Sequence, residues 1–183
     1  TDHDQLTDYH PTIKELGLEG WLKSEVGVEI SPLAAQAFFT ENRLSPASTL
    51  KPPFTEYRSD EITLLQGDFF ALRSAQLEDV TAVYDRASLI ALPPDMRARY
   101  AQHMAVLLRP GVPSLLVTLD YPQREMGGPP FAVSRAEVET LFGADFHIEH
   151  LGERDILSEN PRFQARGLTR LDEQVYRLVR RSG

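Results

Sequence analysis

Three acidic residues follow short apolar runs of the kind that form buried strands. Glu29, Asp68 and Asp85 each stand at or just beyond the end of such a run. Open α/β sheets place their ligand groups just outside the carboxyl ends of parallel strands. A carboxylate there can accept both hydroxyl protons of a ribose, or a hydrogen bond from an exocyclic amine. For each acid alone a surface position or a helix cap is an equal alternative, but the repetition predicts a nucleoside-cofactor site.

Two neighbours of these acids could also do chemistry. Phe69 follows Asp68 and could cover a flat ring, although a core phenylalanine beside an Asp helix cap explains the pair equally well. Arg86 follows Asp85, and its guanidinium carries a permanent charge with five donors in a plane, which suits an anionic ligand. The alternative is a structural ion pair between Arg86 and a nearby acid such as Asp85 or Asp68.

Strands and helices alternate along the chain so that these strand ends would meet. Expected strands cover residues 26–30, 54–58, 62–65, 80–83, 114–119, 146–151 and 174–179, and expected helices cover residues 33–39, 95–108 and 135–142. Residues 46–53 are expected to form a loop. Asp95 is expected to cap the second helix, and Ser134 with Glu137 forms a capping box for the third. Right-handed crossovers predict a mostly parallel sheet between helix layers.

Composition excludes several classes of protein. The 183 residues suit a single domain, and a net charge of −8 argues against nucleic acid as a partner, because phosphate binding needs a basic stripe. The sequence has no cysteine, which excludes disulfides and a thiolate zinc site. His3 and His10 lack further ligands at suitable spacing, so no metal site is expected. No apolar run approaches the roughly 20 residues of a membrane span and no signal peptide is visible, so a cytoplasmic protein is expected. The expected oligomeric state is a monomer.

Six segments between Val26 and Arg181 stand out together: VGVEISPLAAQAFF, ITLLQGDFFAL, VYDRASLIALPPDMRARY, LLVTLDYP, GPPFAVS and ARGLTRLDEQVYRL. With these segments the chain resembles the bacterial thiopurine S-methyltransferase family, a branch of the Rossmann-like S-adenosylmethionine-dependent methyltransferases. The YDR segment followed by LP, together with GPPF, is specific to this family. The resemblance implies an α/β, Rossmann-like methyltransferase fold with a mostly parallel central sheet, an antiparallel C-terminal strand and helices on both faces. Residues 1–183 would form one domain, in which residues 1–24 are an N-terminal lid or helix region.

The resemblance also implies a cofactor, S-adenosyl-L-methionine, and a role for particular residues. Glu29 would hold the ribose, and Asp68 with Phe69 would frame the adenine. Arg86 would lie between cofactor and acceptor and serve as the catalytic residue. Phe131 would line the acceptor pocket, and Arg162 would reach the acceptor from a late loop.

The implied reaction demands little of the side chains. A sulfonium methyl group is already activated, and a thiol, a thiopurine or a selenium or tellurium species would attack it in line. The enzyme would align the reactants about 3 Å apart and exclude water. Two alternatives stay open: a nicotinamide-dependent oxidoreductase, which would need a GxGxxG turn that the sequence lacks, and a degenerate scaffold that binds a nucleoside cofactor without catalysis.

The sequence departs from the family pattern in one place. The family has a strand and a Gly-rich turn ahead of the strand that ends at Glu29, and here Gly17-Leu18 runs almost directly into Glu19-Gly20-Trp21. A parallel sheet without its middle strand would expose unpaired backbone groups. We therefore expect that residues are missing from the sequence as given, with chain breaks near Leu18–Glu19 and near Ser24–Glu25.

Overall fold

The computed structural model describes residues 25–29, 32–59 and 62–182. The chain divides into two compact units, Thr1–Ala71 and Leu72–Gly183, each built from strands and helices as the sequence predicts. The N-terminal region up to residue 24, with His3, His10 and the expected interruptions at Leu18–Glu19 and Ser24–Glu25, lies outside the described residues.

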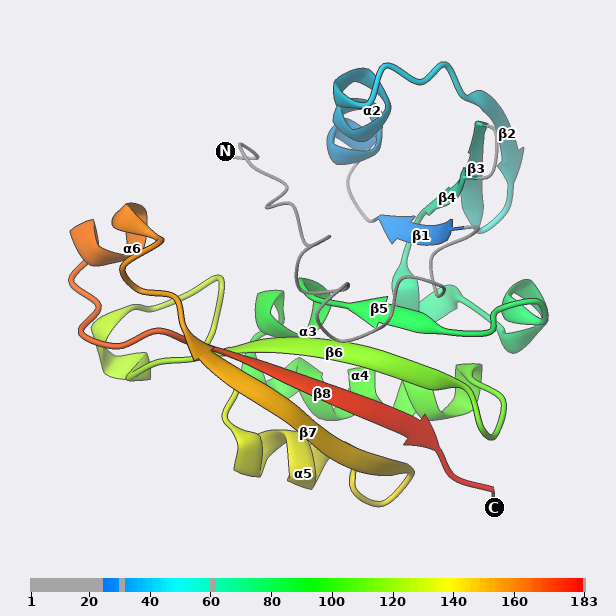
Figure 1. The fold of residues 1–183 in the computed structure, drawn as a ribbon. Coiled ribbons are helices and arrows are strands. Elements are labelled where there is room, and N and C mark those ends of the chain that lie inside the picture. The colour runs from blue at the N-terminus through cyan, green and yellow to red at the C-terminus, as the bar shows by residue number, and fades with distance from the viewer. Residues whose placement is uncertain (1–24, 30–31, 60–61, 183) are drawn as a thin grey trace. The chain divides into compact units, whose positions relative to one another are not determined.

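The first unit contains a four-stranded sheet with the strand order β1-β4-β3-β2 (Figure 1). Its elements are β1 (Glu25–Glu29), α2 (Pro32–Glu41), β2 (Ala47–Lys51), β3 (Phe54–Ser59), β4 (Ile62–Gln66) and the 3₁₀ turn η1 (Phe69–Ala71). β1 runs parallel to β4, whereas β3 is antiparallel to both β2 and β4. The helix α2 packs on β1 and β4 and buries Ala35 and Phe39 beside Leu64.

The structure confirms the predicted hairpin and corrects the predicted loop before it. β3 and β4 pair antiparallel across the short connection after Ser59. Residues 47–51 form the strand β2 instead of a loop, because they pair in full with β3, from Ala47 opposite Arg58 to Lys51 opposite Phe54. All five β2 residues are exposed, so this strand has no buried apolar face that the sequence could have revealed.

The second unit contains a sheet with the order β5-β6-β8-β7 (Figure 1). Its strands are β5 (Val83–Asp85), β6 (Pro113–Asp120), β7 (Phe146–Asp155) and β8 (Asp172–Arg180). Its helices are α3 (Ser88–Ala91), α4 (Pro94–Leu107), α5 (Arg135–Phe142) and α6 (Pro161–Ala165), with 3₁₀ turns η2 (Ser74–Leu77) and η3 (Gln123–Glu125). β5 runs parallel to β6, and β8 is antiparallel to both β6 and β7, as predicted for the C-terminal strand.

The prediction of one mostly parallel sheet is wrong for the described residues. They form two sheets, and only the pairs β1/β4 and β5/β6 are parallel, while four strand pairs are antiparallel. Among the described residues β1 and β5 each pair with a single neighbour.

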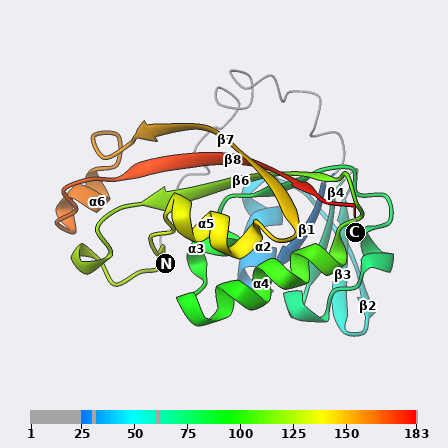
Figure 2. The same cartoon turned by 90° about the horizontal axis from the view of Figure 1, so that it is seen from below.

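Helices α4 and α5 pack against each other and lie on the same side of the second sheet (Figure 2). Tyr100 and Met104 of α4 are buried, as the helical spacing of apolar residues predicts. Pro93 occupies the N-cap position of α4 and Pro94 the first turn, so the predicted cap at Asp95 is wrong. The predicted cap of α5 is confirmed, since Ser134 Oγ accepts a hydrogen bond from the backbone N of Glu137 at 3.3 Å.

Candidate active site

In the first unit, the backbone brings two of the strand-end acids to the same edge of a sheet. β1 and β4 are parallel and pair Glu29 with Gln66, and Asp68 follows two residues beyond Gln66. Because the carboxyl ends of parallel strands share one edge, Glu29 and Asp68 lie at adjacent strand ends. Two carboxylate residues in this arrangement fit the hydroxyl and amine groups of a nucleoside.

Asp68 also shapes its own turn. Its Oδ1 accepts a hydrogen bond from the backbone N of Phe70 at 2.9 Å, which starts η1. Asp68 is exposed, and the half-buried rings of Phe69 and Phe70 meet edge to face with centroids 5.6 Å apart. The structure therefore shows the capping contact of the alternative interpretation, but it places both phenylalanines outside the fully buried core.

In the second unit, Asp85 is a buried anchor at the end of β5. Its Oδ2 accepts a hydrogen bond from the Tyr100 hydroxyl at 2.8 Å, and its Oδ1 accepts one from the backbone N of Ser88 at 3.1 Å. Burial raises the pKa of the Asp85 carboxyl, and the hydrogen bonds from Tyr100 and Ser88 partly oppose that rise. These bonds tie the end of β5 to α3 and α4 and so fix the backbone that carries Arg86.

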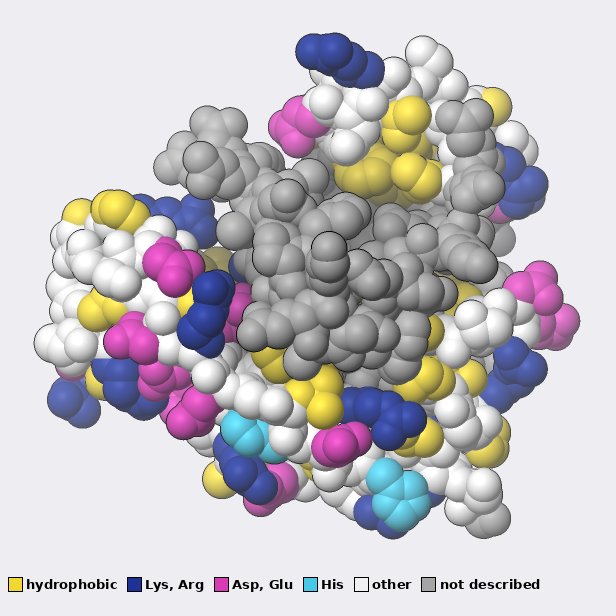
Figure 3. Space-filling model, viewed as in Figure 1, with side chains coloured by type: hydrophobic (Ala, Val, Ile, Leu, Met, Phe, Trp, Pro, Cys, Tyr) yellow, Lys and Arg dark blue, Asp and Glu magenta, His cyan; other side chains and the backbone are white. Residues whose placement is uncertain are grey.

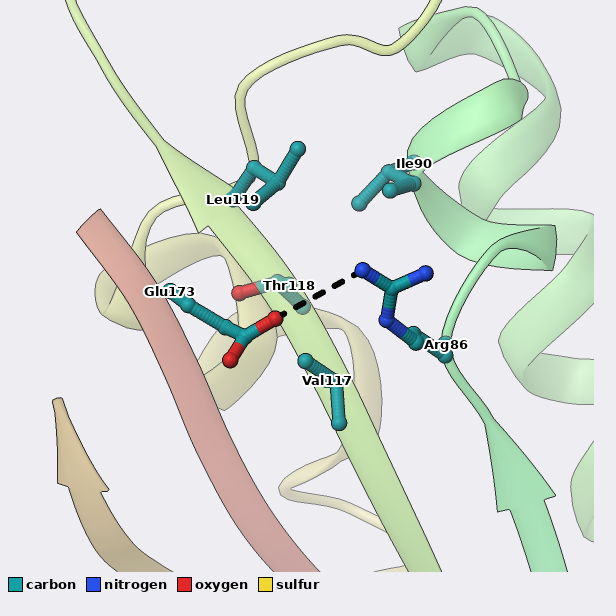
Figure 4. Close-up of a pocket in the computed structure, with 6 residues that line it drawn as sticks. All are labelled: Arg86, Ile90, Val117, Thr118, Leu119 and Glu173. Atoms are coloured by element: carbon teal, nitrogen blue, oxygen red, sulfur yellow. Dashed lines mark ion pairs between the residues drawn. The ribbon is translucent and has the colours of Figure 1, made fainter. Parts of the chain in front are cut away.

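Arg86 faces Glu173 of β8 across a small cavity (Figure 4). Arg86 Nη2 and Glu173 Oε1 are 3.8 Å apart, which makes an ion pair that is longer than a hydrogen bond. The side chain of Glu173 is only 5% exposed, and that of Arg86 is 34% exposed. The cavity has a volume of about 20 Å³. Its lining residues are Arg86, Ile90, Val117, Thr118, Leu119 and Glu173.

Burial and charge act on both members of this pair. Burial raises the pKa of Glu173, and the positive charge of Arg86 opposes the rise. Burial lowers the pKa of Arg86, Glu173 opposes that change, and the positive charge of Arg162 adds to it. Tyr84, on β5, has a pKa raised to about 12 by burial and by the negative charges of Glu173 and Asp85. Charged groups around the cavity therefore influence one another, and Glu173 is the deeply buried member of the ion pair.

Phe131 is connected to the cavity through Ile90. The backbone N of Phe131 donates a hydrogen bond to the Ile90 carbonyl oxygen at 2.7 Å, and Ile90 lines the cavity. Gly128 has a positive φ of 75°, and a Cβ there would come within 2.3 Å of the Phe131 ring. The glycine of the GPPF segment is thus required for the close approach of the phenylalanine.

Arg162 lies on α6, where its guanidinium stands over the ring of Phe163 with 5.0 Å from Cζ to the centroid. Phe163 belongs to a buried cluster that includes Leu119, a cavity-lining residue. The electrostatic coupling to Arg86 places the Arg162 charge near the same region. Within the second unit, the cavity at the carboxyl end of β6 is thus lined by Arg86, linked to Phe131 through Ile90, and influenced by the charge of Arg162. The contacts of these three residues with ligands stay predictions.

The sequence prediction missed Glu173. The alternative considered for Arg86 was a pair with Asp85 or Asp68, but the structure pairs Arg86 with Glu173. The expected last strand started at Gln174, one residue too late to include the acid. An acidic residue directly before the alternating pattern of residues 174–179, inside the LDEQVYRL segment, is the signal that could have revealed it.

Solved structures with low sequence identity share the fold of this chain. A structure described as a SAM-dependent methyltransferase from Anabaena variabilis superposes with a TM-score of 0.61, covering 92% of this chain and 72% of that one at 14% identity. At that identity the likeness establishes the fold alone, which is the α/β class that the sequence predicts.

Sequence comparison then defines the family. A family model described as "Thiopurine S-methyltransferase (TPMT)" matches residues 20–181, so the chain belongs to the thiopurine S-methyltransferase family. A thiopurine S-methyltransferase from Nitrosospira multiformis is 51% identical over 88% of this chain and 76% of its own length, and one from Pseudomonas fluorescens strain SBW25 is 53% identical over the same shares. The family confirms the predicted S-adenosylmethionine-dependent enzyme, and it favours methyl transfer over nicotinamide-dependent oxidation and over a degenerate scaffold.

Proposed function

We propose that this chain transfers the methyl group of S-adenosylmethionine to the sulfur of a thiopurine, or to another small thiol, selenol or tellurium species, and that Arg86 directs the acceptor. The observation that carries the assignment of the acceptor site is the cavity shared by Arg86 and Glu173 at the carboxyl ends of β5 and β6. Ligand groups gather at this edge of α/β sheets.

The cofactor side of the proposal rests on the first unit. Glu29 and Asp68 lie at adjacent strand ends, so we assign Glu29 to the ribose hydroxyls and Asp68 with Phe69 to the adenine. The bound cofactor supplies an activated sulfonium methyl group. The role of these residues is to hold it in one orientation, because alignment of the reacting atoms is the main source of acceleration in a direct displacement.

The acceptor side rests on the second unit. The Arg86 guanidinium offers several donors to a sulfur or selenium anion and stabilises its charge before attack. The Phe131 ring offers a flat apolar surface suited to an aromatic acceptor such as a purine. Arg162, whose charge couples to Arg86, adds to the attraction for an anion.

A small-molecule acceptor agrees with the surface of the protein. Figure 3 shows acidic and basic side chains interspersed over the coloured part of the visible face, and the net charge is −8. No helix of the described residues has the length and apolar character required to cross a bilayer. A monomeric state, a cytoplasmic location and a single domain over residues 1–183 stay predictions.

The decisive experiment combines titration and turnover. Isothermal titration of the purified chain with S-adenosylmethionine and separately with NADH should give a binding curve for the first alone. Methyl transfer should then be followed over a panel of thiopurines, alkanethiols, aromatic thiols and selenols. Binding of NADH without S-adenosylmethionine, or the absence of a methylated product from every acceptor, would contradict the proposal.

A further inference from the structure

We propose that Glu173 accepts the proton of a neutral thiol or selenol, so that the site takes acceptors that are not ionised before they bind. This inference rests on the proposed methyl transfer and extends it with a second residue and a class of substrate. Glu173 would act from β8, opposite Arg86.

The position of Glu173 suits a proton acceptor. Its register partner is Leu119 of β6, and directly paired residues project from the same face of a sheet. Both residues line the cavity that Arg86 enters (Figure 4). A cavity of about 20 Å³ admits one water molecule, and one water is enough to relay a proton to a general base.

Arg86 cannot perform this step. A guanidinium carries donors and no acceptor, and it stays protonated in proteins. A neutral thiol must lose its proton during methylation, because the product sulfur carries carbon in place of hydrogen. Glu173 is the acidic side chain among the six cavity-lining residues, so it is the member of this set that can receive the proton.

Burial, more than the surrounding charges, increases the affinity of the Glu173 carboxylate for a proton. Arg86, which follows β5, pairs with Glu173 at 3.8 Å, and the phenol of Tyr84 on β5 senses its negative charge. On β7 the register partner of Glu173 is Arg154, and the charge of Glu159, beyond β7, also acts on it. Leu119 and Val117 on β6 carry no charge. Burial raises the pKa of Glu173, Arg86 and Arg154 lower it, and Glu159 raises it. A carboxylate with a raised pKa binds a proton more readily than an exposed one.

The step balances as follows for a thiol. The S–H bond breaks and its proton moves to the Glu173 carboxylate, directly or through one water. The sulfur electron pair, held by Arg86, forms a bond to the methyl carbon, and the bond from that carbon to the sulfonium sulfur breaks. The products are a methyl thioether and the uncharged thioether of the donor. Glu173 then releases its proton to solvent.

The test compares two acceptors in Glu173→Gln. At pH 6.5 an alkanethiol is largely protonated, whereas a nitro-substituted aromatic thiol is ionised. The variant should lose about 100-fold in kcat/KM with the alkanethiol, within the range for loss of a general base. It should change by less than about threefold with the aromatic thiol, which needs no proton acceptor. Raising the pH toward ionisation of the alkanethiol should restore its turnover.

Each other outcome overturns the inference. An equal loss with both thiols would mean that Glu173 only positions Arg86, and no loss with either would mean that it has no part in the reaction. The exposed Glu149→Gln removes a carboxylate paired with Arg177 on the same sheet and should behave as wild type. Turnover of the ionised thiol by the wild-type protein supports methyl transfer independently of Glu173. Glu173→Asp keeps a carboxylate and should recover part of the alkanethiol activity that Glu173→Gln loses.

Discussion

The buried guanidinium of Arg97 holds the carboxylate of Glu137 at 2.6 Å between Nη1 and Oε1. Arg97 is 1% exposed, and it also donates to the carbonyl oxygens of Leu92 and Ala132 at 3.0 and 3.1 Å. Its Cζ lies 5.7 Å from the centre of the Phe131 ring. One side chain thus joins the start of α4, the loop of the proposed acceptor site and the start of α5.

Replacement of Arg97 by methionine should therefore destabilise the fold. Loss of the guanidinium leaves the Glu137 carboxylate, which is 31% exposed, and two carbonyl groups without their donor, at a cost of about 1–3 kcal/mol. Urea unfolding followed by circular dichroism measures this free energy. Arg135→Ala removes an exposed pair with Glu139 and should cost about 0–1 kcal/mol, so similar losses for the two variants would contradict the structural role of Arg97.

A second prediction concerns the glycines of the loop before Phe131. Gly128→Ala adds a methyl group within 2.3 Å of the Phe131 ring at a positive φ, so it should destabilise the fold by about 1–3 kcal/mol and raise KM for an aromatic acceptor. Gly127→Ala is the matched control, because a Cβ there meets no atom within 4 Å. If both variants bind the acceptor as wild type does, Phe131 does not line its pocket.

Local sequence signals predicted the helices and strands, whereas the side-chain contacts of the site depend on residues far apart in the sequence. Ser134 and Glu137 define the start of α5 because a cap depends on residues three positions apart. The burial of Arg97 depends on Ala132 and Glu137, far along the chain, and the apolar stripe of α4 does not indicate it. The pairing of Arg86 with Glu173 joins the first and the last strands of the second unit in chain order, which no local pattern contains.

The strand order depended on distant pairing in the same way. The hairpin of β3 and β4 follows from two neighbouring apolar runs, but β2 is exposed along its whole length and is defined by its pairing with β3. The division into two sheets could not be read from any one strand. It depends on which strands find a partner, and in the described chain β1 and β5 each find one.

A third prediction tests the cofactor assignment of Glu29. Glu29→Gln removes a charge-assisted contact to the ribose, so S-adenosylmethionine should bind more weakly by about 1–3 kcal/mol. Isothermal titration measures the change directly. Glu25, at the opposite end of β1, provides the control variant Glu25→Gln, which should bind as wild type. Equal affinities for all three proteins would remove Glu29 from the site.

A fourth prediction concerns the pH dependence of stability through Asp85. Burial raises its pKa in the folded protein above the unfolded value of about 4, so the folded state binds more protons between these two values. The stabilisation from the protonated form is complete below the unfolded pKa and is lost as the pH rises through the folded pKa. Asp85→Asn cannot titrate, and its Oδ1 can still accept from Ser88.

The free energy of unfolding of Asp85→Asn should therefore increase relative to wild type as the pH rises from about 4 toward neutrality. Urea unfolding at several pH values measures both curves, and their difference isolates Asp85 from the other titrating groups. A difference that stays constant with pH would show that the Asp85 carboxyl has the same pKa in the folded and unfolded states.

The last prediction separates a catalytic Arg86 from a structural one. Arg86→Ala should lower the catalytic efficiency by roughly 10–100-fold, or about 1.4–2.7 kcal/mol, if the guanidinium orients the acceptor. Arg86→Lys keeps a charge and loses the planar fork, so it should recover only part of that loss. Arg177→Ala, which removes an exposed arginine from β8 of the same sheet, is the matched control and should retain full activity.

The pair with Glu173 makes the structural alternative specific. If Arg86 served only to neutralise Glu173, its loss would leave a buried carboxylate that can take up a proton, and the melting temperature of Arg86→Ala would fall while activity per folded molecule stayed near that of wild type. Melting curves and steady-state kinetics on the same preparation distinguish the two. A destabilised but fully active Arg86→Ala variant would disprove the catalytic role. A variant that is as stable as wild type but loses roughly 10–100-fold in catalytic efficiency would establish it.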